Sequence, residues 1–206
     1  RGNCASDFAI LGRRGRLEGG LAKRPTQVFA LSDAENLYLA FRCREPDMNR
    51  LAAQTDNFVR YEQLMACGED LVEVVLDPGG RARGPEDLYH LVIKPGGILV
   101  AERGIAAASP DGRSAPWASG ARVAVSRQAN EWIVELAIPL TSFAAGGAAV
   151  AGPRFWGVNF GRFASAGQES SNWAGAPRHL YHPKSLGTIY LGGATPGTTA
   201  ATRAEE

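Results

Sequence analysis

Glu73 stands out because it is a carboxylate within a run that otherwise has the composition of a buried strand. The run covers residues 69–77 and ends at a Pro-Gly-Gly turn, where neither a strand nor a helix continues unbroken. We expect it to form the central strand of the fold. Because side chains alternate along a strand, the carboxylate faces away from Val72, Val74 and Leu76 and shares its face with other apolar residues. Such a carboxylate must be paired or must line a wet groove, so Glu73 belongs either to a structural ion pair or to a binding site.

A second group of residues has the chemistry needed to bind a sugar. An aromatic ring buries the apolar face of a pyranose, while planar polar groups bond to its hydroxyls. Trp173 and Tyr181 could supply the rings, because both lie in a predicted surface loop over residues 164–186. Asn159 and Arg162 lie on the predicted strand before this loop and could supply polar contacts.

Catalysis is the alternative use of Glu73. Glycoside hydrolysis needs two carboxylates about 5 to 10 Å apart, and Glu73 and Glu135 would meet this need if their strands faced one groove. Each of them lies in the middle of a strand pattern without an activating neighbour in the sequence. No serine or cysteine occupies a recognisable nucleophile motif, and no phosphate-binding or dinucleotide fingerprint occurs. We therefore predict that the protein is not an enzyme.

Length and charge exclude several other classes of function. The 206 residues include 22 Lys and Arg against 21 Asp and Glu, with no basic block, so nucleic acid is not an expected partner. No apolar run approaches the roughly 18 residues of a membrane helix, so membrane insertion is not expected. Residues 1–20 lack the basic and apolar segments of a signal peptide.

The three cysteines, Cys4, Cys43 and Cys67, fit neither a disulfide framework nor a metal-binding pattern. Cys43 continues the alternation of the strand before it, so we expect a small buried hydrophobe there. A bridge between Cys43 and Cys67 stays open as the alternative.

Short β-prone runs separated by turns predict the architecture. Trp132 and Trp156 lie within such runs and are assigned to the core. Hairpins are expected from residues 27–31 with 37–42, 87–94 with 98–103, and 121–127 with 131–138; single strands from 8–11, 155–163 and 188–191; a short helix from 48–54; and a loop carrying Trp117 from 104–120. About nine strands without a convincing longer helix indicate an all-β fold, a two-sheet antiparallel β-sandwich of jelly-roll-like type.

Five motifs along the chain together resemble family 9 carbohydrate-binding modules and their relatives in the DOMON-like superfamily. The resemblance extends from about Thr26 to Leu191, and the motifs follow one another in the order found in that family. They are residues 36–41 (NLYLAF), 69–78 (EDLVEVVLDP), 131–139 (EWIVELAIP), 156–162 (WGVNFGR) and 182–187 (HPKSLG). The resemblance implies a β-sandwich that binds sugar without catalysis of its own, usually as an accessory part of a secreted or surface enzyme.

The resemblance also implies which residues contact the sugar. In modules of this family that bind tightly, two tryptophans sandwich the terminal sugar, and a glutamate, an arginine and asparagines bond to its hydroxyls. Glu73 matches the glutamate, whereas His90 stands at the arginine position. Cys67 stands where the first tryptophan is expected, and Tyr181 replaces the second. We therefore expect weak binding at a site built from six residues: Glu73, His90, Tyr181, Trp173, Arg162 and Asn159. Trp117 and Tyr61 are further candidates for an aromatic ring that would take the place of the first tryptophan.

The same resemblance bears on cofactors, because some DOMON relatives bind haem through methionine, histidine or lysine. Residues of the first two types in this chain are Met48, Met65, His90, His179 and His182. His179 and His182 flank a Leu-Tyr pair, a spacing that more often has no metal role, so haem is not expected. The resemblance leaves room for a structural calcium ion.

The expected organisation has three parts: an irregular lead-in or the end of an upstream segment over residues 1–25, the sandwich over 26–191, and a linker or disordered tail over 192–206. The resemblance implies a module linked to other domains of a larger protein. It also implies an extracellular, periplasmic or cell-surface location.

Overall fold

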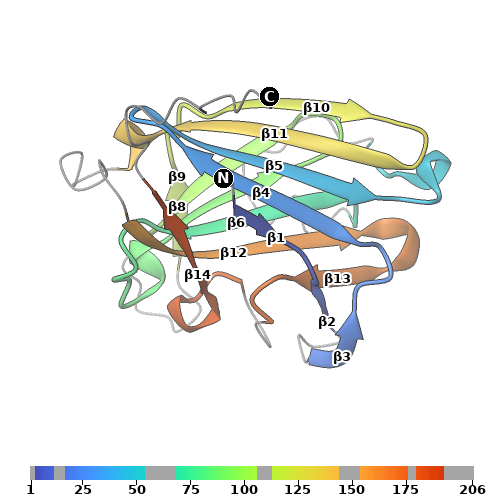
Figure 1. Cartoon of the computed structure of the whole chain (residues 1–206), viewed down its shortest axis with the longest axis horizontal. Coiled ribbons are helices and arrows are strands. Elements are labelled where there is room, and N and C mark those ends of the chain that lie inside the picture. Colours follow the sequence, from blue (N-terminus) through green and yellow to red (C-terminus); the bar gives the residue numbers. More distant parts are fainter. Residues whose placement is uncertain are drawn as a thin grey trace, which may run out of the picture.

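The protein folds into two packed antiparallel sheets, as the computed structural model in Figure 1 shows. The structure describes residues 3–11, 17–53, 68–105, 113–143, 154–175 and 180–192. The smaller sheet has the order β1-β4-β5-β11-β10, and the larger has the order β3-β2-β13-β12-β6-β7-β8-β9, with β14 also paired to β12. The predicted all-β, two-sheet antiparallel sandwich is confirmed.

The bounds of the strands are as follows. The small sheet contains β1 (Asn3–Ala5), β4 (Thr26–Ser32), β5 (Asn36–Arg44), β10 (Arg122–Arg127) and β11 (Glu131–Pro139). The large sheet contains β2 (Ala9–Leu11), β3 (Leu17–Leu21), β6 (Leu71–Asp77), β7 (Tyr89–Ile93), β8 (Leu99–Ile105), β9 (Arg113–Pro116), β12 (Arg154–Ala164), β13 (Glu169–Asn172) and β14 (Gly187–Leu191). Helical structure in the described ranges is confined to short 3-10 segments, η2 (Met48–Arg50), η3 (Pro85–Asp87), η4 (Leu140–Ser142), η6 (Ser165–Gly167) and η7 (Pro183–Ser185).

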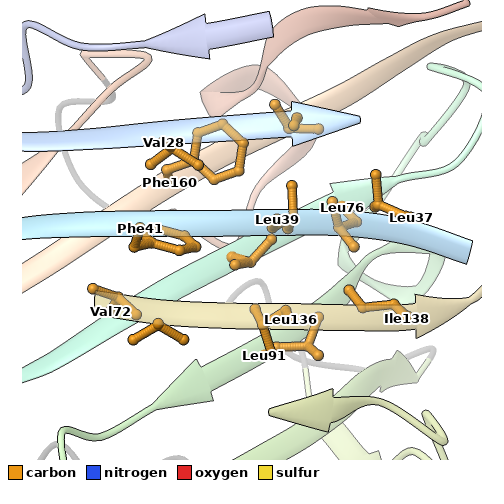
Figure 2. Close-up of a cluster of buried hydrophobic side chains, with 14 of the residues drawn as sticks. Val28, Leu37, Leu39, Phe41, Val72, Leu76, Leu91, Leu136, Ile138 and Phe160 are labelled. Atoms are coloured by element: carbon orange, nitrogen blue, oxygen red, sulfur yellow. The ribbon is translucent and has the colours of Figure 1, made fainter. Parts of the chain in front are cut away.

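Alternating apolar side chains fill the space between the sheets, as expected for facing pleated surfaces. Figure 2 shows Leu39 and Phe41 of the small sheet beside Val72, Leu76 and Phe160 of the large one. The predicted core residues of β6 and β11 are all buried: Val72, Val74, Leu76, Trp132, Val134, Leu136 and Ile138.

β6 is an interior strand of the large sheet, between β12 and β7. All seven of its residues are buried, so both of its faces are covered. The inner face contributes to the main core, while Leu71 on the outer face packs with Val92, Val100 and Phe163 in a second, smaller cluster. The predicted central strand is therefore confirmed, and Glu73 lies on its outer face.

The three predicted hairpins are present as β4–β5, β7–β8 and β10–β11. Two predicted loops were wrong in part, because residues 104–120 contain β9 and residues 164–186 contain β13. The lead-in is more regular than expected, since β1, β2 and β3 all lie within it. The short helix predicted at 48–54 is a single 3-10 turn, Met48–Arg50.

Cys43 is fully buried in the core, as predicted, and its burial raises the pKa of the thiol to about 12. Cys4 is exposed on β1. Cys67 lies outside the described residues, so the bridge between Cys43 and Cys67 stays an open expectation. No helix in the described ranges is long and apolar enough to cross a membrane.

Candidate functional site

Glu73 and His90 meet on the outer face of the large sheet. Glu73 lies on β6 opposite Val92, and His90 lies on the adjacent β7 opposite Val75, so the two residues are diagonal neighbours across the strand pair. His90 Nε2 lies 3.0 Å from Glu73 Oε2. Their side chains are only 5% and 6% exposed, so each supplies a polar partner that the other needs in this position. The sequence predicted that Glu73 is either paired or lines a groove, and the structure pairs it with His90, which is itself a residue of the predicted sugar site.

Tyr181 joins this pair from the segment before η7. Its ring centroid lies 5.5 Å from that of His90, at an interplanar angle of 36°. Its hydroxyl donates to the Leu88 carbonyl oxygen at 3.2 Å. Burial raises the pKa of Tyr181 well above its usual range, and the nearby Glu102 carboxylate adds to the rise. The structure therefore brings together three of the six predicted site residues, Glu73, His90 and Tyr181.

Glu102 belongs to the same face and was missed at the sequence level. It lies on β8 directly opposite His90 and is 1% exposed. The Ser114 hydroxyl on β9 donates to its carboxylate. The alternation of side chains along the predicted strand 98–103 could have shown which residues share a face with Glu102. That Glu102 lies opposite His90 could not be predicted, because it depends on the register between β7 and β8.

Asn159 lies on the same outer face, on β12, opposite Val75 of β6. Its amide is fully buried and holds two loops together. Nδ2 donates to the Ser185 carbonyl oxygen at 2.8 Å, and Oδ1 accepts from the Ala174 amide at 3.1 Å. Asn159 thereby holds Ala174 and Ser185, which lie on either side of the segment that carries Tyr181.

Trp173 lies at the edge of the core. Its ring centroid is 5.8 Å from that of Phe160, and its ring fills the space beside Gly187, where a Cβ atom would meet it at 2.7 Å. These contacts are on the core side of β12, because Phe160 points inward. The structure does not place Trp173 beside the Glu73–His90 pair.

Arg162 is also separated from the pair. It lies three residues after Asn159 on β12, and this odd spacing turns its side chain to the inner face. There Nη1 donates to the carbonyl oxygens of Arg44 and Arg24, at 2.9 and 3.1 Å, and Nη2 lies 3.3 Å from Glu45 Oε2. Its described partners make it a structural residue at one end of the sandwich.

The other candidates have structural positions or lie outside the described residues. Trp117 packs on Tyr89 and Phe143, with ring centroids 4.7 and 5.2 Å away. His182 is exposed, and its Nδ1 accepts from the Lys184 amide at 3.1 Å. Tyr61, Met65 and His179 are not among the described residues. Met48 packs against the core, and the described residues contain no group of three or more His, Cys, Asp or Glu suited to a metal ion.

The two carboxylates considered for catalysis do not share a groove. Glu73 lies on the outer face of the large sheet, whereas Glu135 is exposed on β11 of the small sheet, on the opposite side of the sandwich. The side chains next to Glu135 along β11, Val134 and Leu136, point into the core. A glycosidase geometry needs carboxylates about 5 to 10 Å apart, and a sandwich places these two much further from each other.

The fold is similar to several solved structures. Two are structures of a family 9 carbohydrate-binding module from Caldicellulosiruptor kristjanssonii. The one in complex with cellotriose is 12% identical, with a TM-score of 0.60, over 97% of this chain and 89% of that chain. The one in complex with glucose is 14% identical, with a TM-score of 0.60, over 94% and 87%.

A third structure is from Bacteroides uniformis and is provisionally described as a carbohydrate-binding protein. It is 14% identical, with a TM-score of 0.65, over 92% of this chain and 86% of that chain. No protein-family model matches the sequence, and no curated protein matches it. At these identities the likeness concerns the fold: the chain has the fold of family 9 carbohydrate-binding modules, in agreement with the order of its sequence motifs.

Proposed function

We propose that the protein is a non-catalytic carbohydrate-binding module that binds a mono- or oligosaccharide on the outer face of the large sheet. The observation that carries the proposal is the position of Glu73, His90 and Tyr181, with a carboxylate and an imidazole 3.0 Å apart and a tyrosine ring 5.5 Å from the imidazole. Structural neighbours in complex with glucose and cellotriose support the choice of ligand.

Each of the three residues has a distinct role in this proposal. The Glu73 carboxylate accepts hydrogen bonds from sugar hydroxyls, and its charge makes these bonds stronger than neutral ones. The His90 ring donates or accepts according to its protonation and tautomer. The Tyr181 ring stacks against the apolar face of the pyranose. Asn159 acts indirectly, because its amide holds Ala174 and Ser185 on either side of the Tyr181 segment.

Binding in this proposal is weak for two reasons. Histidine lacks the planar fork with which an arginine makes paired hydrogen bonds. A single aromatic wall also gives less stacking than a pair: losing one ring removes about 1 to 3 kcal/mol, and therefore lowers affinity by roughly one or two decades.

A ligand can reach Glu73 and His90 only when this face opens, because both side chains are almost fully buried. Tyr181 contacts His90 on this face. It is half-buried, and the hydrogen bond to Leu88 and the ring contact with His90 hold it in place. A sugar that stacks on Tyr181 and bonds to Glu73 would replace the contact between the tyrosine and the imidazole.

The same burial favours a second candidate function, a structural or protein-interaction sandwich in which the Glu73–His90 pair only stabilises the sheet. The two functions differ in their response to sugar. A ligand that binds only the native state raises its stability, whereas a structural module shows no sugar dependence.

The test is calorimetry together with thermal unfolding in the presence of glucose, cellobiose, xylobiose and galactose. We expect one or more of these sugars to bind the wild type and to raise its Tm. Glu73→Gln and Tyr181→Ala should abolish the effect, whereas the matched control Glu135→Gln, on the opposite face of the sandwich, should retain it. A Tm that no sugar shifts at tens of millimolar, or a shift that survives Glu73→Gln and Tyr181→Ala unchanged, would contradict the proposal.

We extend the proposal to the cellular context that the resemblance implies. The module would act as an accessory domain of a larger protein in an extracellular, periplasmic or cell-surface location. Fractionation of the source cells with an antibody against the module tests this, and recovery of the full-length protein from the cytosol alone would contradict it.

A further inference from the structure

Phe155 and Tyr190 form an exposed aromatic pair away from the Glu73–His90 pair. Phe155 is 65% exposed and Tyr190 is 47% exposed, and Phe155 is the most exposed large hydrophobic residue in the described part of the chain. Their ring centroids are 5.2 Å apart, with an interplanar angle of 48°. The two rings therefore form one continuous apolar surface rather than two isolated side chains.

The strands fix this pair in place. Phe155 on β12 and Tyr190 on β14 are direct partners in the sheet. The next residues along each strand, Trp156 and Ile189, are buried in the core, so alternation turns both exposed rings to the outer face of the large sheet. A surface built on strands anchored in the core keeps its geometry better than one built on a loop.

Polar residues of β14 and of the turn after β6 lie on either side of the Phe155–Tyr190 pair. Thr188, exposed on β14, lies opposite Gly157 on the same face. On the other side lies the turn after β6, where the Asp77 carboxylate accepts hydrogen bonds from the amides of Arg81 and Ala82. A Cβ atom on Gly80 in this turn would lie 3.4 Å from the Phe155 carbonyl oxygen. The exposed Thr188 hydroxyl thus lies on the same face as the two rings and can bond to a polar ligand, while the Asp77 carboxylate holds the neighbouring turn in place.

The size of this surface decides which kind of ligand fits it. A stable protein interface buries about 800 Å² on each partner, far more than two side chains expose. Single apolar residues on a surface are common and need no ligand, but adjacent aromatic rings suit a small ligand with an apolar face and hydroxyls at its edge. A pyranose ring has this character.

We propose that Phe155 and Tyr190 form a second carbohydrate contact, a stacking surface for the pyranose rings of a β-linked polysaccharide chain. The choice of carbohydrate rests on the proposed function. Phe155 shares the outer face of β12 with Gly161, which lies opposite Glu73. Gly161 lies six positions after Phe155, about 20 Å along the strand, so a polysaccharide can contact both places while a monosaccharide occupies one. Two linked contacts then raise the apparent affinity for long chains.

The test compares long and short ligands on matched variants. The double variant Phe155→Ala/Tyr190→Ala removes the surface, and Phe29→Ala/Leu31→Ala removes two exposed apolar residues of β4 in the small sheet as the control. Retention is measured on microcrystalline cellulose, xylan and mannan, and calorimetry is run with glucose and cellobiose. Each variant is first checked for a wild-type circular dichroism spectrum and elution volume in gel filtration.

We expect wild type and control to be retained by at least one polysaccharide, and the double variant to lose roughly tenfold or more in affinity for it. Binding of glucose should be unchanged in the double variant, and Phe155→Tyr/Tyr190→Phe should restore retention, because it keeps both rings. Glu73→Gln should show the reverse pattern, with loss of glucose binding and residual retention on the polysaccharide.

The outcomes separate this inference from the proposed function. If glucose does not bind at all but polysaccharide retention still depends on Phe155 and Tyr190, the site at Glu73 is wrong and the aromatic surface stands. If the double variant is retained as well as wild type, or wild type is retained by none of the polysaccharides, the inference is overturned. It is also overturned if the double variant changes the oligomeric state and leaves retention unaltered, since the pair is then a protein contact.

Discussion

Arg162 and Glu45 form an ion pair inside one end of the sandwich, with Nη2 and Oε2 3.3 Å apart. Glu45 is fully buried and Arg162 is 2% exposed. Arg24 joins the same carboxylate through Nε, at 3.0 Å. The hydrogen bond that Arg24 Nε donates to the Glu45 carboxylate raises the pKa of Arg24, so the guanidinium stays charged. The pair links the loop after β5 to β12, and thus to the large sheet.

Removal of Glu45 should destabilise the protein strongly, because it leaves the Arg162 charge buried without its partner. We expect Glu45→Ala to lower the free energy of unfolding by about 3 to 5 kcal/mol. Glu135→Ala, at an exposed position on β11, should change it by no more than about 0.5 kcal/mol. Urea unfolding measures both. Similar stabilities for the two variants would show that the buried pair contributes little.

A charge in the inner face of β6 should prevent folding. Val74 has no exposed surface and packs in the core between the sheets. Val74→Asp would bury an unpaired carboxylate, at a cost of several kcal/mol, a large part of the stability of a typical domain. Circular dichroism should show loss of the β-sheet spectrum, while Ala124→Asp on exposed β10 should keep it. A folded Val74→Asp variant would contradict the assignment of this strand to the core.

Cys43 should make the protein less stable at alkaline pH. Burial raises the pKa of its thiol to about 12, while an unfolded cysteine titrates near 8.5. Above that pH the unfolded state releases a proton that the folded state keeps, so the free energy of unfolding falls as pH rises. Between about pH 8.5 and 10 the loss should reach about 1 to 2 kcal/mol.

Urea unfolding at both pH values tests this contribution in Cys43→Ala and in the control Cys4→Ser. The fall in the free energy of unfolding with rising pH should become smaller in Cys43→Ala. It should persist in Cys4→Ser, because Cys4 is exposed. The raised pKa values of Tyr38 and Tyr181 act in the same direction, but only above the ordinary tyrosine range near 10. An unchanged slope in Cys43→Ala would assign the effect to other groups.

Gly104 should be essential for the position of Tyr181. A Cβ atom there would overlap the Pro85 carbonyl oxygen and crowd the Tyr181 hydroxyl. The Leu88 carbonyl oxygen accepts from both the Gly104 amide, at 3.1 Å, and the Tyr181 hydroxyl, at 3.2 Å. Gly104→Ala should therefore cost about 1 to 3 kcal/mol of stability and change sugar binding.

The control for Gly104 is Gly96→Ala, since a Cβ atom on Gly96 meets its nearest neighbour, the Ala53 carbonyl oxygen, at an ordinary 3.7 Å. Denaturation and calorimetry on both variants complete the test. Equal stability and equal sugar binding in the two variants would show that the contact between Gly104 and Pro85 does not constrain this region.

Alternation of apolar residues was sufficient to predict the main strands and their core faces. β6 and β11 carry valine, leucine, isoleucine or tryptophan at every second position, and both pack as expected. β9 and β13 could not be found in this way. Their sequences, RSAP and ESSN, contain no apolar alternation, so pairing with β8 and β12 decides their structure.

The candidate site was predictable in part. The resemblance to the family suggested Glu73, His90 and Tyr181, and the structure places these three together. Strand periodicity already separates Asn159 from Arg162, because side chains that are an odd number of positions apart, here three, point to opposite faces of a strand. The partner of Arg162 was not predictable, since Glu45 is far away in the sequence and their contact depends on how the two sheets pack.

Residues 3–11 pass from one sheet to the other within a few positions. β1 pairs with β4 in the small sheet, and β2 pairs with β13 in the large one. Between them Asp7 has a φ of 61°, and Phe8, only 2% exposed, is inserted in the core. A pulling force applied at Asn3 would therefore first load the hydrogen bonds of β1 and then, through the anchored Phe8, those of β2. The hydrogen bonds of the two sheets should therefore break one after the other when residues 3–11 are extended, so this short segment connects the two sheets mechanically.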